Sequence, residues 1–179
     1  VDYFFKSLAN MDEPLPIGSG QTISQPLTVA FMLELLNVQE GQTVLEIGSG
    51  TGWVSALIAH MVGPNGRVVG VEIMQSLADA ARVRLRERGF DTVEIVCADG
   101  SVGYPSAAPY DRIIGSASAP KTPTWLGDQL KPGGIIVFPV KDGIQRIFAH
   151  NDPSSTQRFT IETYPYFAFV PLVGKRGHR

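Results

Sequence analysis

The sequence predicts an α/β fold whose doubly wound parallel sheet carries helices on both faces. The first observation is at residues 44–61. There an apolar stretch suited to a buried strand precedes Gly48, Gly50 and Gly52, and apolar residues at helical spacing follow. The second is an apolar strand at 67–71 that ends at Glu72. Doubly wound folds place a carboxylate for ribose hydroxyls about twenty residues after such a turn.

The spacing of the glycines separates the possible nucleotide sites. A dinucleotide turn needs G-x-G-x-x-G, whereas residues 48–52 read G-x-G-x-G, with the third glycine one position early. No Lys-Ser or Lys-Thr pair directly follows the glycine turn to hold a triphosphate, which excludes a P-loop. Glu46 suits a cationic ligand, such as a sulfonium with an amino-acid tail, and would repel a pyrophosphate.

Length and composition limit the function classes. The 179 residues suit one domain, and the net charge of −2 gives no basic field for nucleic acid. Cys97 is the single cysteine, so no disulfide forms within the chain. His60, His150 and His178 have no ligand spacing, and we expect no metal site. No apolar run reaches a membrane span and residues 1–15 contain no signal-peptide core, so we expect a cytoplasmic protein without a membrane partner.

The segment before the glycine turn combines a turn-rich loop with a helix start. Prolines at 14 and 16 predict a loop over residues 12–20 after an amphipathic start. A helix is expected at about 26–36, with Pro26 in its first turn and Ser24 as its cap. Thr22 and Ser24 also place two hydroxyls beside a helix N-terminus, which makes a cradle for an anionic group.

The rest of the chain alternates predicted strands and helices. Strands are expected at 92–98, 110–116 and 135–140, and helices at 76–88 and 124–130. Residues 116–120 are small and would line a pocket after the 110–116 strand. A hairpin is expected from strands at 144–149 and 158–164. Residues 167–173 should pack near the site, and 175–179 should form a frayed tail.

Several segments resemble the protein-L-isoaspartate O-methyltransferases. E-x-G-x-G-x-G at 46–52 resembles motif I of the class I methyltransferases that use S-adenosylmethionine. The family likeness lies in E-P-L-P-I-G at 13–18, G-Q-T-I-S-Q-P at 20–26, D-G-S-x-G-x-P at 99–105, A-P-Y-D-R-I-I at 108–114, A-P at 119–120, Q-L-K-P-G-G at 129–134 and F-V-P-L at 169–172. The segment at 20–26 is the most diagnostic of these.

The resemblance implies an architecture and a site. The fold is a Rossmann-like class I methyltransferase sheet with a C-terminal antiparallel hairpin. Residues 1–179 form a single domain, in which 1–25 are the N-terminal loop and acceptor-site segment and 26–179 the cofactor-binding α/β core. The implied cofactor residues are Glu46, Gly48, Ser49, Gly50, Thr51, Gly52, Glu72, Ile73, Asp99 and Gly100. Asp99 would pair with the adenine amino group.

The implied reaction is methyl transfer from S-adenosylmethionine to the α-carboxylate of L-isoaspartyl residues in damaged proteins, which leaves S-adenosylhomocysteine. Thr22, Ser24 and Ala119 would bind the acceptor, with Ser24 the catalytic residue through orienting the carboxylate. That carboxylate is already ionised, since its reference pKa is about 3.5, and it needs no general base. We expect a monomer without a nucleic-acid partner.

Two departures from the family keep other functions open. Little of the usual N-terminal part precedes residue 12, and Trp53 stands where a tyrosine is usual. One alternative is a class I methyltransferase that acts on a small molecule or RNA. Another is a non-catalytic module that binds S-adenosylmethionine.

Overall fold

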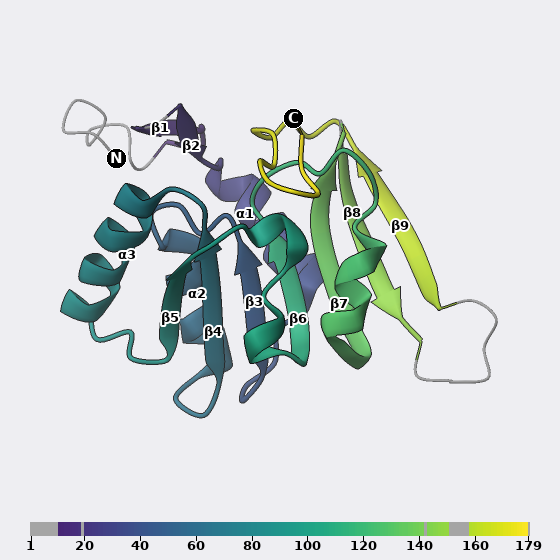
Figure 1. Cartoon of the computed structure of the whole chain (residues 1–179), viewed down its shortest axis with the longest axis horizontal. Helices are drawn as coiled ribbons and strands as arrows, with labels where there is room; N and C mark the ends of the chain where they lie inside the picture. Colours follow the sequence, from purple (N-terminus) through teal and green to yellow (C-terminus); the bar gives the residue numbers. More distant parts are fainter. Residues whose placement is uncertain (1–10, 19, 142, 151–157, 179) are drawn as a thin grey trace.

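The computed structural model describes residues 11–18, 20–141, 143–150 and 158–178. Its centre is a seven-stranded sheet in the order β5-β4-β3-β6-β7-β8-β9 (Figure 1). The strands of this sheet are β3 (Thr43–Ile47), β4 (Arg67–Glu72), β5 (Val93–Cys97), β6 (Tyr110–Gly115), β7 (Leu130–Val140), β8 (Gly143–Ala149) and β9 (Phe159–Pro165). β3 to β7 are mutually parallel, and β8 runs antiparallel to both β7 and β9. The doubly wound α/β sheet and its C-terminal hairpin are therefore confirmed.

Strand β3 lies in the middle of the parallel part and is buried on both faces. Val44 pairs in register with Val68 of β4 and with Arg112 of β6. Successive side chains of a strand point to opposite faces. Val44 and Leu45 are both fully buried, so each face of β3 is covered, as a parallel sheet requires.

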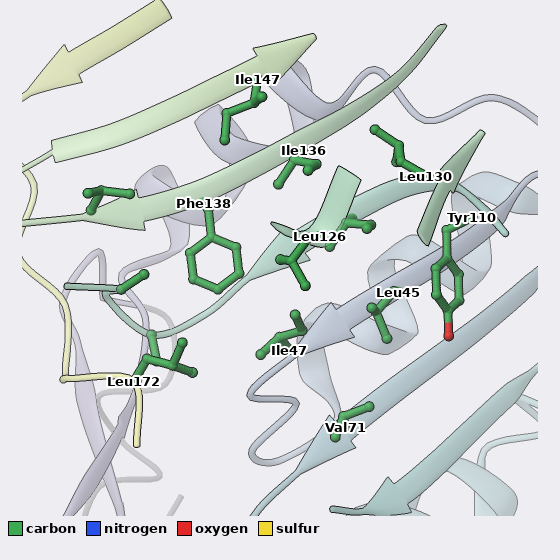
Figure 2. Packing of buried hydrophobic residues seen from close by; sticks show 14 of the residues in the cluster. Leu45, Ile47, Val71, Tyr110, Leu126, Leu130, Ile136, Phe138, Ile147 and Leu172 are labelled. Atoms are coloured by element: carbon green, nitrogen blue, oxygen red, sulfur yellow. The ribbon is translucent and has the colours of Figure 1, made fainter. Parts of the chain in front are cut away.

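The two faces are covered by different kinds of helix. The helices α1 (Pro26–Leu36) and α2 (Trp53–Val62) bury their apolar residues on the Val44 face, and α3 (Gln75–Glu87) packs beside α2 over β5. The opposite face carries the 3-10 helices η2 (Gly100–Val102), η3 (Pro105–Ala107) and η4 (Thr124–Gln129). Figure 2 shows Leu126 of η4 against Leu45, Ile47 and Phe138 in this second core. The helix expected at 124–130 is thus a 3-10 helix.

Two local expectations about strands are wrong. Residues 15–23 form a small antiparallel sheet, β1 (Leu15–Gly18) with β2 (Gln21–Ile23), in place of an irregular loop. A two-stranded sheet is all edge, so Pro16 removes no ladder hydrogen bond that must be made. Strand β7 starts at Leu130 because residues 131–134 bulge out between the pairs Tyr110–Leu130 and Arg112–Ile135.

Helix α1 has its expected bounds but a different cap. Gln25 is the N-cap residue and its side chain makes no capping hydrogen bond. The Leu27 amide of the first turn donates instead to Asp12 Oδ1 at 2.8 Å. Ser24 is therefore not the cap, because a carboxylate brought from 15 residues away takes that role.

The amphipathic start and most of the polar hairpin loop lie outside the described residues. No helix in the described ranges is long and apolar enough to cross a membrane.

Gly115 and Phe138 form a size-matched pair in the second core. Gly115 ends β6, and a Cβ built there would overlap the fully buried Phe138 ring. Gly115→Ala should therefore destabilise the fold by about 1–3 kcal/mol through overpacking. Phe138→Leu should relieve that overlap, so the double variant should lose less than the sum of the single losses. Urea unfolding of the three variants measures the coupling, and strictly additive losses would contradict this account.

Candidate active site

A cleft opens at the carboxyl ends of β3, β4 and β6, which we call the main cleft. Its floor is the turn after β3, where Gly48, Gly50 and Gly52 have φ of +85°, +52° and +81°. These angles favour glycine. The Gly48 amide donates to Val71 O at 2.8 Å, so the turn is fixed to β4. A ligand can thus approach the backbone between two strand ends, as expected.

Glu46 is a buried acid in the wall of the main cleft. Its side chain accepts hydrogen bonds from the Ser55 hydroxyl and, at 3.3 Å, from the Ser116 hydroxyl. Burial and, to a smaller extent, the charge of the nearby Glu72 raise the pKa of Glu46 to about 7, against the lowering effect of these hydrogen bonds. A cation bound in the cleft would favour the ionised form of this carboxyl and would be attracted by its negative charge.

Glu72 ends β4 and organises the turn. Its Oε2 accepts from the Gly50 amide at 2.8 Å, and its Oε1 accepts from the Met74 amide at 2.9 Å. Each carboxylate oxygen has two lone pairs, so both can accept a further hydrogen bond from a ligand hydroxyl. Ile73, the next residue, also lines the main cleft. This arrangement fits the ribose-binding role expected of Glu72.

Ser49 supplies a test of whether the turn suits a ligand. Its hydroxyl is buried, lines the main cleft, and has no hydrogen-bond partner among the described residues. Buried hydroxyls without partners are rare, and each calls for an explanation such as a ligand. A cleft with cation-favouring acids, an open glycine turn and an unpartnered hydroxyl fits an adenosyl sulfonium with an amino-acid tail. Thr51 and Gly100 also line this cleft, and Gly52 adjoins the turn at the start of α2.

Asp99 follows β5 and hydrogen-bonds the C-terminal segment. Its carboxylate accepts from the Ser101 amide at 2.9 Å and from the Lys175 amide at 2.7 Å, and it does not line the main cleft. Partial burial raises its pKa, but these hydrogen bonds outweigh burial, and the net pKa is lowered. Asp99 therefore holds the C-terminal segment, and its expected pairing with an adenine amino group stays a prediction. The tail at 175–178 is therefore not frayed, and His178 N also donates to Leu172 O.

The C-terminal segment forms one wall of the main cleft, whereas the sequence predicted only that it packs near the site. Residues 170–173 line the main cleft, and Ser118 exchanges backbone hydrogen bonds with Val170 and Leu172 at 2.8 and 2.9 Å. Figure 1 shows this segment, in yellow, at the same end of the sheet as β1 and β2. The apolar run at 167–173 was the available signal. Met74 and Leu77 also line the cleft, and no motif marked them.

A second cavity, which we call the adjoining groove, continues from the main cleft. It is lined mainly by apolar and aromatic side chains, including Phe31, Phe167 and Phe169. Phe31 stacks on Phe167 with ring centroids 5.4 Å apart. Thr22 and Ser24 line both cavities, and no described residue hydrogen-bonds the half-buried Ser24 hydroxyl. The two hydroxyls singled out from sequence are thus at the junction.

Ala119 is packed inside the fold, next to small residues that line the main cleft. It is fully buried, its amide donates to Pro139 O at 2.9 Å, and it lines neither cavity. Of the small residues at 116–120, Ser116 and Ala117 line the main cleft. Ala119 packs behind them, and its expected contact with the acceptor stays a prediction.

Sequence comparison identifies the family. A family model described as Protein-L-isoaspartate(D-aspartate) O-methyltransferase (PCMT) matches residues 1–177. The protein-L-isoaspartate O-methyltransferase 2 of Archaeoglobus fulgidus is 45% identical over 176 residues, which are 98% of this chain and 80% of that protein. The Methanosarcina mazei protein-L-isoaspartate O-methyltransferase is 43% identical over 179 residues, which are 100% of this chain and 73% of that one.

The comparison with solved structures agrees with the family match from the sequence. One protein-L-isoaspartate O-methyltransferase superposes with a TM-score of 0.82 at 28% identity and covers 93% of this chain; this chain spans only 54% of that one. A Plasmodium falciparum β-aspartate methyltransferase in complex with S-adenosyl-L-homocysteine has a TM-score of 0.80 and covers 94% of this chain and 83% of its own, with an identity of 22% that shows the fold alone. Because the family model covers nearly the whole chain and the Archaeoglobus relative is 45% identical across 98% of it, the chain belongs to the protein-L-isoaspartate(D-aspartate) O-methyltransferase family.

Proposed function

We propose that this chain methylates the α-carboxylate of L-isoaspartyl residues in damaged proteins, with S-adenosylmethionine as methyl donor. The observation that carries the proposal is the junction of the main cleft with the adjoining groove at Thr22 and Ser24. The main cleft suits the donor, and the groove suits a peptide. The family to which the chain belongs carries the same activity in its name.

The chemistry at the junction suits a carboxylate acceptor. S-adenosylmethionine supplies a methyl group on a sulfonium, which a carboxylate oxygen can attack without losing a proton. The residues that line both cavities are Thr22, Ser24, Ser116 and Val170, none of which is a general base. An amine or hydroxyl acceptor would need such a base, whereas a carboxylate with a reference pKa of about 3.5 is already ionised. Catalysis then rests on orientation by hydroxyl donors.

The alternatives fit the groove less well. No Lys or Arg is among the described residues that line the adjoining groove, and RNA binding depends on cations that neutralise phosphates.

The direct test of the proposed function incubates the chain with S-adenosylmethionine and either an isoaspartyl peptide or the same peptide with a normal aspartyl residue. Methyl ester should form only on the isoaspartyl peptide. Calorimetry should show binding of S-adenosylhomocysteine and none of NAD, and the reverse result would overturn the assignment. A cytoplasmic monomer without nucleic acid remains our expectation.

Removing Glu72 should weaken cofactor binding. Glu72→Ala loses the carboxylate that holds the Gly50 and Met74 amides and that would accept the ribose hydroxyls. Hydrogen bonds to a charged group contribute about 1.5–3 kcal/mol, so the Kd for S-adenosylhomocysteine should rise about tenfold or more. Glu87→Ala, an exposed acid of α3, is the matched control and should bind as wild type. An unchanged Kd in a folded Glu72→Ala protein would remove Glu72 from the site.

Binding of S-adenosylmethionine should depend on pH through Glu46. Its pKa of about 7 leaves the carboxyl mostly protonated at lower pH, and a bound cation favours the ionised form. Affinity should therefore rise as the pH rises through about 7, with proton release. The stability of the free protein depends on the pH with the opposite sign. Ionisation opposes folding, so the contribution of Glu46 to the free energy of unfolding falls between pH 4.5 and about 7.

Calorimetry in buffers of different ionisation enthalpy measures that proton release, and urea unfolding across the same pH range measures stability. Glu46→Gln cannot ionise and should bind more weakly with no pH slope near 7. The same slope in both proteins would place the titrating group elsewhere.

Ser24→Ala should lower activity without lowering stability. Since Ser24 caps no helix, its loss should change the free energy of unfolding by less than about 0.5 kcal/mol. Loss of one hydrogen bond to an ionised acceptor should lower kcat/KM for the isoaspartyl peptide about tenfold to a hundredfold. Ser24→Thr should recover part of it. Ser76→Ala, at an exposed serine of α3, serves as the matched control. Full activity in folded Ser24→Ala would leave Thr22 as the orienting hydroxyl.

A further inference from the structure

Ser116 lies where the main cleft meets the adjoining groove, and it comes from the sheet. It follows β6 directly, and its amide donates to Ile47 O of β3 at 2.8 Å, which fixes its backbone. It lines both cavities, together with Thr22, Ser24 and Val170 from the two ends of the chain. Its side chain is half-buried and therefore within reach of ligands in either cavity.

The Ser116 hydroxyl is also engaged with a buried acid. Its Oγ donates to Glu46 Oε1 at 3.3 Å, while Ser55 donates to the other carboxylate oxygen, Oε2. Hydroxyl-to-oxygen hydrogen bonds are normally about 2.7–2.8 Å, so the Ser116 bond is a long one. A serine has a single O–H donor. Ser116 can thus serve Glu46 or a group in the adjoining groove, but not both at once.

We propose that Ser116 is a positioning residue whose hydroxyl turns from Glu46 to the acceptor carboxylate when the cationic end of the cofactor occupies the cleft beside Glu46. The proposal rests on the function proposed above, and it concerns this chain's own residues. A cation beside Glu46 replaces the donor that Ser116 supplies. It also screens the acceptor carboxylate from the Glu46 charge, and the two anions would otherwise repel each other.

The consequence is a coupling between the two ligands. Without the cofactor, the Ser116 donor is committed to Glu46 and the acceptor meets one hydroxyl fewer. With the cofactor, the acceptor meets the hydroxyls of Ser24 and Ser116. Each ligand therefore binds more tightly when the other is present, and by the same factor.

The test measures binding of an isoaspartyl peptide to the whole chain by fluorescence anisotropy, with and without saturating S-adenosylhomocysteine. This product keeps the amino group and transfers no methyl. Gain of one hydrogen bond to a charged group should tighten peptide binding to the wild-type protein about tenfold. Ser116→Ala should lose most of that gain, and Ser116→Thr, which keeps a hydroxyl, should restore it. In steady state with saturating S-adenosylmethionine, Ser116→Ala should lower kcat/KM for the peptide about tenfold.

Ser118→Ala is the matched control. Ser118 is a buried serine two positions on, its hydroxyl donates to Lys141 O at 3.3 Å, and it lines neither cavity. Ser118 holds the cleft wall only through backbone hydrogen bonds, which Ser118→Ala retains, so this variant should keep the wild-type coupling. Thermal unfolding checks that each variant is folded. If wild type methylates the peptide and Ser116→Ala retains the wild-type coupling and kinetics, the role of Ser116 is overturned. If wild type methylates no isoaspartyl peptide, the proposed function fails instead.

Discussion

The hydrogen bond from the Gly50 amide to Glu72 Oε2, at 2.8 Å, is the contact on which the site depends. A turn with positive φ at alternate residues cannot continue the ladder of β3, so its amides need other acceptors. Val71 O takes those of Gly48 and Ser49, and Glu72 takes that of Gly50. Because β4 is locked in parallel register to β3, the turn is positioned by the sheet itself. The carboxylate that would bind a ribose is therefore also the group that shapes the floor beneath it.

The opposite wall of the main cleft depends on contacts between distant parts of the chain. Asp99 accepts from the Lys175 amide across 76 positions, and Ser101 Oγ accepts from the Arg176 amide. Gly174, between them and residues 170–173, has a φ of +138° and no room for a Cβ against Asp99. The segment that lines the cleft is thus held at both ends, by Ser118 on one side and by Asp99 on the other. Asp99 acts on the cleft through this wall.

These contacts explain how much of the molecule could be predicted from its sequence. The strand, glycine turn and helix at 43–62 were predictable because every determinant is local: apolar alternation, positive-φ glycines and helical spacing. The cap of α1 was not, because Ser24 is a good local candidate and Asp12 displaces it through tertiary structure. The burial of Ala119 was not predictable for a similar reason. A small side chain suits close packing as well as access to a pocket, and only the fold shows that Ala119 is fully buried. The partner of Asp99 lies in a tail that local composition marks as frayed.

A carboxylate acceptor also changes what a perturbed pKa signifies in this site. Strongly shifted groups in clefts are the usual candidates for acid–base catalysis, and Glu46 fits that description with its pKa of about 7. Yet the acceptor arrives ionised, so no proton has to be removed at the junction, where the chain places hydroxyls. Glu46 is then best understood as part of the cofactor site. Burial opposes the charge of its carboxylate, so a cation bound beside it contributes more to stabilising the ionised form. The orienting residues are hydroxyl side chains that no shifted pKa marks, so only their position in the fold identifies them.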